Sequence, residues 1–112
     1  DLDNIFPAME FLTASNKKGL GDKVHNFDNG NKIPYDETFI TKDVVIGDNV
    51  WFGNHVTVLG GVSIGEGAII QAKALVHKDV PDYAIVGGNP CDIIKFRNIE
   101  HYKKLKSEKK FH

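Results

Sequence analysis

Between residues 46 and 81, a large apolar residue occupies every sixth position, and Val or Ala follows four positions after each one. The large apolar residues are Ile46, Phe52, Val58, Ile64, Ile70 and Val76, and the smaller ones are Val50, Val56, Val62, Ala68, Ala74 and Val80. A period of six matches neither the 3.6-residue period of a helix nor the two-residue alternation of a long strand. It predicts a chain that forms one short strand, turns a corner and repeats, as in a parallel β-helix.

The repeat also predicts which side chains stack. If three units close one turn of the solenoid, residues eighteen positions apart lie over one another: Ile46 on Ile64, Phe52 on Ile70 and Val58 on Val76. Full burial of each such side chain contributes about 1.5–3 kcal/mol. Gly and Asn tolerate positive φ at the corners. The corner candidates are Gly47, Asn49, Gly53, Asn54, Gly60, Gly61, Gly65 and Gly67.

The first third of the chain departs from this rhythm. Residues 9–15 predict a strand, and residues 16–39 are dense in Gly, Asn, Asp and Lys. The second segment predicts a long loop, far above the usual ~4–6 residues of a connection, and loops of that length are often functional. Residues 40–45 partly restore the period, with Ile40 and Val44 in the inward places.

The last third predicts strands, a turn and a helix. We expect a strand at residues 83–86, a structural Gly-Gly-Asn-Pro turn at 87–90 and a further short apolar run. Residues 98–110 predict a helix that Asn98 caps. Its apolar stripe consists of Ile99, Tyr102 and Leu105.

Composition excludes several classes of protein. The 112 residues suffice for one domain, and a net charge of -1 argues against binding nucleic acid through a basic surface. The apolar stretches are too short for membrane insertion, and no secretion signal opens the chain. Cys91 is the only cysteine, which excludes an intrachain disulfide and agrees with a cytoplasmic location. Six clean units supply only two turns, so we expect early turns that are degenerate or that belong to a longer protein.

The hexapeptide array followed by VHKDVPDYAIVGGNPCDIIKFR resembles the hexapeptide-repeat acyltransferases, in the branch of sugar, maltose, galactoside and xenobiotic O-acetyltransferases. NVWFG, KDVP and GGNP in this order carry the resemblance, which covers about residues 9–97. It implies an all-β, left-handed parallel β-helix over residues 1–97, with an extruded loop at 16–39 and a short C-terminal α-helix at 98–112. The left hand is an implication of the resemblance, because crossover sterics alone favour the right hand.

The resemblance also implies a reaction. Acetyl-CoA would donate the acetyl group to a hydroxyl of a sugar, polysaccharide precursor or similar small acceptor, with no metal. The enzyme would be a homotrimer whose active sites lie in grooves between subunits, and a loop histidine would act as general base. The sequence leaves the acceptor unidentified.

His25 is the leading catalytic candidate. It opens HNFDN inside the long loop, and the resemblance expects a histidine followed shortly by an aspartate there. Imidazole is a suitable base near neutral pH. The alternative is a solvent-exposed loop histidine without a catalytic role. Asp36 or Glu37 would orient His25, and the sequence does not decide between them.

Three residues are candidates for the acceptor side. Asp28 orients His25, binds an acceptor hydroxyl, or simply forms the turn in NFDNGN. Trp51 points outward and either walls the acceptor site or packs between subunits. Asn16 follows the first expected strand and faces the acceptor.

The candidates for binding CoA are Gly60, Gly61, Ala72, Lys73, Lys78, Lys95 and Arg97. Glycines let the backbone approach the pantetheine arm, and cations neutralise the phosphates. For each cation the alternative is a solvated surface charge. IIQAKALVHKDVP departs from the family run IGAGSVVTKDVP at Lys73 and His77. Lys73 would either block part of the groove or add a phosphate contact, and His77 would hydrogen-bond where the family has Thr; the sequence leaves open whether either changes CoA binding.

Two other functions remain as alternatives. One is a non-catalytic trimeric β-helix module, which would not bind CoA. The other is a γ-carbonic-anhydrase-like zinc enzyme, which needs three histidines that meet across an interface. The spacing of the five histidines disfavours the zinc enzyme. Cys91 is not a nucleophile, because no activating base lies near it in sequence.

Overall fold

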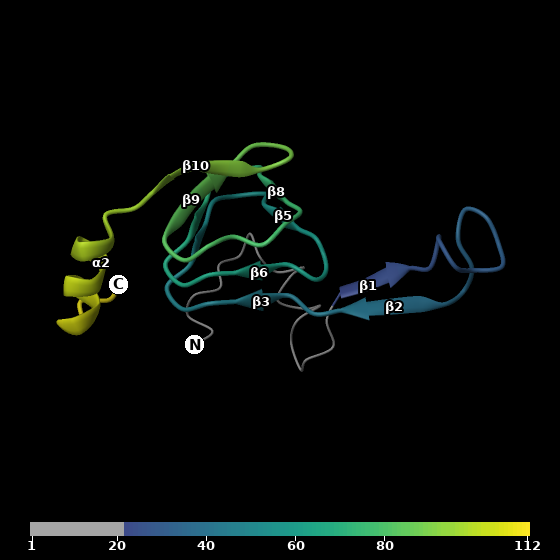
Figure 1. Ribbon diagram of the computed structural model, residues 1–112, viewed down its shortest axis with the longest axis horizontal. Coiled ribbons are helices and arrows are strands. Elements are labelled where there is room, and N and C mark those ends of the chain that lie inside the picture. The colour runs from purple at the N-terminus through teal and green to yellow at the C-terminus, as the bar shows by residue number, and fades with distance from the viewer. Residues whose placement is uncertain (1–21) are drawn as a thin grey trace.

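The structure is a computed structural model that describes residues 22–112 (Figure 1). The strand expected at residues 9–15 lies outside the described residues. The hexapeptide array forms six two-residue strands: β3 (Val45–Ile46), β4 (Trp51–Phe52), β5 (Thr57–Val58), β6 (Ser63–Ile64), β7 (Ile69–Ile70) and β8 (Leu75–Val76). β3 pairs with β6, β4 with β7 and β5 with β8, always in parallel and in a register of eighteen residues. The predicted stacking is therefore confirmed.

The inward side chains of these strands form one apolar core. All six small residues of the repeat are buried, and so are five of the six large ones. Ile46 is partly buried and packs against the same cluster. The first residue of each strand points the other way and is exposed or half-buried, as the two-residue alternation of a strand requires. The six-residue rhythm thus sets which side of each strand faces the core.

Positive φ falls at one fixed place in the repeat, three residues after the large apolar residue. Five units have it there, at Asn49, His55, Gly61, Gly67 and Lys73. The expectation of positive φ at Gly47, Gly53, Gly65, Asn54 and Gly60 is therefore wrong. The glycine that follows the large residue serves close packing instead, because a Cβ on Gly53 would lie 2.5 Å from the amide nitrogen of Ala72.

Two longer strands continue the array. β9 (Ala84–Gly87) lies parallel to β7, and β10 (Asp92–Phe96) pairs antiparallel with β9 around an irregularity between Ile93 and Lys95. Together they extend one sheet to the order β10-β9-β7-β4. The strand expected at 83–86 is confirmed with a shift of one residue.

Helix α2 (Ile99–Ser107) packs at one end of the stacked strands (Figure 1). The Asn98 side chain accepts a hydrogen bond of 2.9 Å from the His101 amide, which confirms the predicted cap. The helix ends before the predicted residue 110. Of its predicted stripe, Tyr102 is buried, Leu105 is half-buried and Ile99 is exposed.

A β-hairpin projects from the opposite end (Figure 1). It consists of β1 (Asp22–His25) and β2 (Phe39–Lys42), which pair antiparallel. The expectation of a loop throughout residues 16–39 is therefore wrong for residues 22–25 and 39. The inward placement of Ile40 is also wrong, since its side chain is 41% exposed in β2, whereas Val44 is buried at 1% exposure. The stacked strands begin only after the hairpin closes.

Candidate functional site

The hairpin carries the candidate base at the end of β1. His25 lies directly opposite Phe39 in the strand register, and their ring centroids are 4.9 Å apart. The imidazole also stacks on the Tyr35 ring, with centroids 3.8 Å apart and ring planes inclined by 23°. His25 is exposed, so its ring nitrogens are accessible to a ligand. Two aromatic rings therefore flank an accessible imidazole.

Two of the carboxylates considered for orienting His25, Asp36 and Glu37, are engaged elsewhere. Asp36 Oδ1 accepts a 2.8 Å hydrogen bond from the Thr38 amide, and its Oδ2 accepts one of 3.3 Å from the Asn31 amide. The Thr38 bond is the main reason why the pKa of Asp36 lies below its ordinary value. Glu37 pairs with Lys32 at 2.8 Å. Within residues 22–112, neither carboxylate is hydrogen-bonded to the imidazole.

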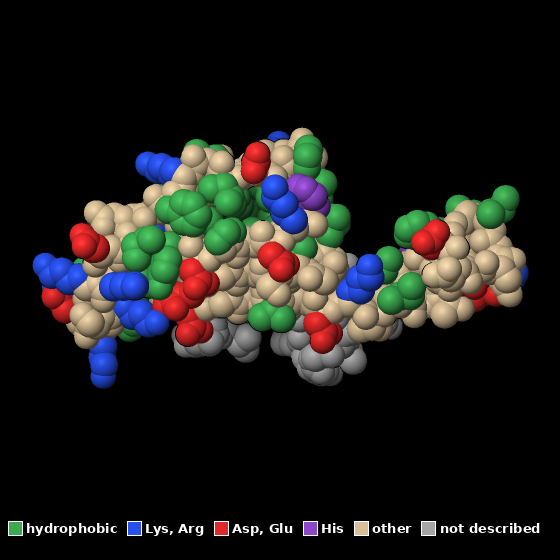
Figure 2. Space-filling model, in the orientation of Figure 1, with side chains coloured by type: hydrophobic (Ala, Val, Ile, Leu, Met, Phe, Trp, Pro, Cys, Tyr) green, Lys and Arg blue, Asp and Glu red, His purple; other side chains and the backbone are tan. Residues whose placement is uncertain are grey.

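The acceptor-side candidates are placed as follows. Asp28 is exposed in the bend that follows β1. Trp51 points outward from β4 and is 59% exposed, as predicted. Its register partner in β7 is Ile69, whose partner in β9 is Ile85, so the three form an outer row across the sheet. Figure 2 shows apolar side chains gathered near β9 and along the hairpin. Asn16 lies outside the described residues.

Three of the CoA candidates share one edge of the stacked strands. Gly60 and Gly61 form the turn between β5 and β6, where the Gly61 amide donates a 3.0 Å hydrogen bond to the Asp43 carbonyl at the base of the hairpin. Lys78 lies in the segment after β8, which stacks on that turn. Its Nζ is 3.6 Å from Asp92 Oδ1. The amide of Ile93, followed by Lys78, holds the pKa of Asp92 below its ordinary value.

The other CoA candidates lie elsewhere. Ala72 and Lys73 form the turn between β7 and β8, where the Lys73 amide donates to the Asn54 carbonyl at 2.8 Å. Lys95 is exposed in β10. Arg97 donates from Nη1 to the Gly67 carbonyl at 3.0 Å and lies over the Tyr102 ring, 4.9 Å from its centroid. The Gly67 carbonyl takes one of the five N–H donors of this guanidinium, so Arg97 stays a candidate phosphate contact.

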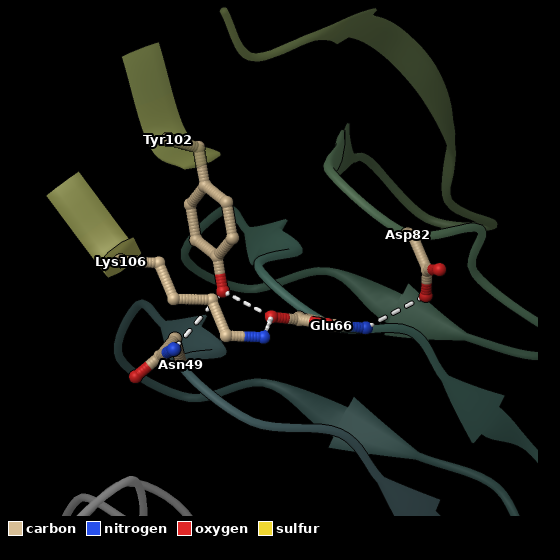
Figure 3. Close-up of polar contacts among 5 residues, drawn as sticks. All are labelled: Asn49, Glu66, Asp82, Tyr102 and Lys106. Atoms are coloured by element: carbon tan, nitrogen blue, oxygen red, sulfur yellow. Dashed lines mark hydrogen bonds and ion pairs between the residues drawn. The ribbon is translucent and has the colours of Figure 1, made fainter. Parts of the chain in front are cut away.

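A second polar group joins helix α2 to the stacked strands, and sequence analysis missed it (Figure 3). We call Asn49, Glu66, Tyr102 and Lys106 the helix-dock cluster. The Tyr102 hydroxyl donates to Glu66 Oε2 at 2.9 Å and accepts from Asn49 Nδ2 at 3.0 Å. Lys106 Nζ also pairs with Glu66 Oε2, and the Glu66 amide donates to Asp82 Oδ1 at 2.8 Å.

The helix-dock cluster has the composition of an acid–base site but the bonding of a structural one. The hydrogen bond from Lys106 holds the pKa of Glu66 below its ordinary value of 4.5, and the same bond raises the pKa of Lys106. Burial raises the pKa of Tyr102 above 10.0. Each titratable group is therefore held in its ordinary charge state at neutral pH, and the four side chains are hydrogen-bonded to one another. The cluster fixes α2 and offers no base for catalysis.

The cluster should make stability depend on pH. Because folding lowers the pKa of Glu66, its contribution is present above pH 4.5 and is lost as the pH falls through and below that value. Glu66→Gln should therefore be less stable than the wild type at pH 7 and should lose less stability on acidification to about pH 3.5. Thermal unfolding followed by circular dichroism at both pH values measures this difference.

Glu37→Gln is the matched control for that experiment. Glu37 also pairs with a lysine, but both side chains are well exposed, and such surface pairs contribute about 0–1 kcal/mol. We expect this variant to show the same pH dependence of stability as the wild type. Asp36 and Asp92, whose pKa values are also lowered by folding, contribute to that dependence in both proteins. An unchanged slope in Glu66→Gln would contradict the role assigned to the cluster.

Residues 22–112 contain no helix with the length and apolar character that a membrane crossing needs. The same residues contain no group of three His, Cys, Asp or Glu side chains arranged to hold a metal ion.

Comparison with known proteins confirms the hexapeptide-repeat resemblance. Residues 43–78 match the family described as Bacterial transferase hexapeptide (six repeats). Over 51 residues, the chain is 61% identical to a protein named putative acetyltransferase YvoF from Bacillus subtilis (strain 168). This alignment covers 46% of the chain and 30% of that relative.

Two solved structures share the arrangement of strands. Galactoside acetyltransferase in complex with coenzyme A aligns at a TM-score of 0.54 and 36% identity, over 57% of this chain and 32% of that one. The second is the hexapeptide-repeat-containing acetyltransferase VCA0836 from Vibrio cholerae O1 biovar eltor, complexed with acetyl coenzyme A. It aligns at a TM-score of 0.58 and 34% identity, over 66% of this chain and 39% of that one. The chain spans only 25–30% of the length of the curated relatives it matches.

Proposed function

We propose that this chain forms a left-handed parallel β-helix and catalyses direct transfer of an acetyl group from acetyl-CoA to a hydroxyl group. The acceptor is a sugar, a polysaccharide precursor or a similar small molecule. The observation that carries this proposal is the eighteen-residue stack of hexapeptide units, aligned at more than 30% identity with two acetyltransferases that hold coenzyme A or acetyl coenzyme A. The hairpin that projects from this stack carries an exposed histidine, His25, at the end of β1.

His25 acts as the general base in this proposal. Its imidazole takes the proton of the acceptor hydroxyl as the oxygen forms a bond to the thioester carbonyl carbon. A backbone amide stabilises the resulting oxyanion. The carbon–sulfur bond then breaks, and the CoA sulfur leaves as a thiol after receiving the proton from the imidazolium. The reaction needs no covalent enzyme intermediate and no metal. Asn16, Asp28 and Trp51 are proposed to line the acceptor side.

CoA is proposed to lie along the edge that contains Gly60, Gly61 and Lys78. This edge is supported by its place at the base of the hairpin, since the Gly61 amide bonds to Asp43 immediately after β2. Lys78 is exposed and meets Asp92 only at 3.6 Å, so a phosphate can replace that surface partner at little cost. Ala72, Lys73, Lys95 and Arg97 are proposed as further contacts.

A homotrimer completes the proposal. The outer row of Trp51, Ile69 and Ile85 gives the sheet an apolar outer face that a neighbouring subunit can cover. The hairpin projects beyond the stacked strands of its own chain, which suits a site shared between subunits (Figure 1). A cytoplasmic location is consistent with acetyl-CoA as the donor.

Calorimetric titration with CoA and a transfer assay test the function. We expect saturable binding of CoA, and release of free CoA thiol from acetyl-CoA that rises when a suitable hydroxyl-bearing sugar is added. Methylated analogues of the same sugar, which lack the accepting hydroxyl, serve as controls. The absence of CoA binding would favour the non-catalytic trimeric module instead. Activity that depends on stoichiometric zinc would favour the zinc enzyme.

A further inference from the structure

We propose that Tyr35 is the positioning residue for His25 and holds the imidazole by stacking, in place of an orienting carboxylate. This inference rests on the proposed function only where it calls His25 the base. The stacking itself is a property of the hairpin. Its basis is the near-parallel contact between the two rings, 3.8 Å between centroids and 23° between planes.

The hairpin fixes where Tyr35 lies. Strand register places Phe39 opposite His25, and the Asn26 amide extends the ladder by donating to the Thr38 carbonyl at 3.2 Å. Asp36, the residue after Tyr35, caps this ladder by accepting from the Thr38 amide at 2.8 Å. Hydrogen bonds thus hold the backbone next to Tyr35 close to the ends of both strands. The Tyr35 ring therefore lies against the His25 ring.

Asp36 therefore affects His25 indirectly, through the turn that positions Tyr35. Its carboxylate holds the turn, the turn holds Tyr35, and Tyr35 holds the imidazole. This chain of contacts explains why a carboxylate stands close to His25 in sequence without a hydrogen bond to it in residues 22–112.

Stacking suits a base on an exposed hairpin. A stacked aromatic pair is stabilised beyond its buried area, and this gain offsets part of the entropy lost when a side chain is fixed. The contact uses the face of the imidazole and leaves both ring nitrogens at its edge. An acceptor hydroxyl must then approach in the ring plane, where the nitrogen lone pair lies. A carboxylate would have occupied one of those nitrogens.

Other exposed aromatics on the hairpin do not share this geometry. Phe27 is 70% exposed in the same turn region, and its ring is not among the stacked pairs of the described residues. The Phe39 ring is tilted by 46° to the His25 ring, so it contacts the imidazole without stacking on it. Among residues 22–112, Tyr35 is the aromatic residue whose ring lies nearly parallel to the imidazole.

The experiment compares Tyr35→Leu with Tyr35→Phe. Both keep an apolar side chain that supports the hairpin, but only Phe keeps a flat ring. In Tyr35→Leu we expect the upfield ring-current shift of the His25 imidazole protons in the NMR spectrum to disappear, and kcat to fall roughly 10- to 100-fold with KM for acetyl-CoA unchanged. Tyr35→Phe should keep both the shift and kcat within about twofold. Phe27→Leu is the matched control and should behave like the wild type.

The readouts separate this inference from the proposed function. Imidazole shifts that are the same in Tyr35→Leu and wild type would overturn the stacking, whatever the activity. A lost shift with unchanged kcat, in a protein whose activity requires His25, would overturn the positioning role. Full activity of a His25 variant would instead refute the proposed base while leaving the stacking intact. The amide resonances of β1 and β2 report whether the hairpin itself persists in each variant.

Discussion

Replacing His25 with alanine should lower kcat for acetyl transfer by roughly 10²- to 10⁴-fold, the usual contribution of a general base. The loss follows because His25 is the proposed base that takes the hydroxyl proton as the oxygen attacks the thioester. KM for acetyl-CoA should change little. His25 lies on the hairpin, whereas the proposed CoA contacts lie on the stacked strands. Steady-state measurement of CoA release, with acetyl-CoA varied at saturating acceptor, separates the two constants.

His101→Ala is the matched control for that substitution. His101 is also exposed, but it lies on α2, and only its backbone amide takes part in the helix cap. We expect wild-type kcat and KM from this variant. Equal turnover by His25→Ala and the wild type would remove His25 from the mechanism. A parallel loss in both variants would point to a general effect on stability.

The stacked strands could be predicted because their signal is local and repeated. Each unit places a large apolar residue and a smaller one at fixed positions, and the resulting pattern survives variation such as Phe52 among aliphatic residues. The assignment fails where the register is ambiguous. Ile40 fits the six-residue period, but in the structure it faces Val24 across the hairpin, because antiparallel pairing of β1 and β2 takes precedence there.

The surroundings of His25 are less accessible from sequence. Its motif suggested a base in a loop, but the contact with Tyr35 depends on a hairpin whose largely polar turn carries no periodic signal. The helix-dock cluster shows the same limit over a longer range. Asn49 and Tyr102 stand 53 residues apart, and their hydrogen bond depends on where α2 packs, which no local pattern specifies. Local periodicity predicts the core, while single polar contacts depend on the completed fold.

The largest expected loss of stability comes from Ile70→Ala. Ile70 is 1% exposed and occupies the middle of an inward column, with Phe52 in register on one side and Val86 on the other. Removing three carbons there loses buried apolar surface and leaves a cavity that the stacked backbone cannot close, so we expect the free energy of unfolding to fall by about 2–5 kcal/mol. Urea unfolding at a fixed protein concentration measures the change.

Ile94→Ala is the matched control, with the same substitution on a strand but with 53% of the side chain exposed. Its cost should be below about 1 kcal/mol, since little buried surface is lost. In a repeat array each unit is stabilised mainly by its neighbours, so a cavity in a central strand weakens the contacts on both sides at once. Similar losses in the two variants would contradict the assignment of inward and outward positions. The proposed CoA edge belongs to the same stack of strands as Ile70. Because Ile70→Ala unfolds at a lower temperature, it should lose CoA binding at temperatures where Ile94→Ala still binds CoA like the wild type.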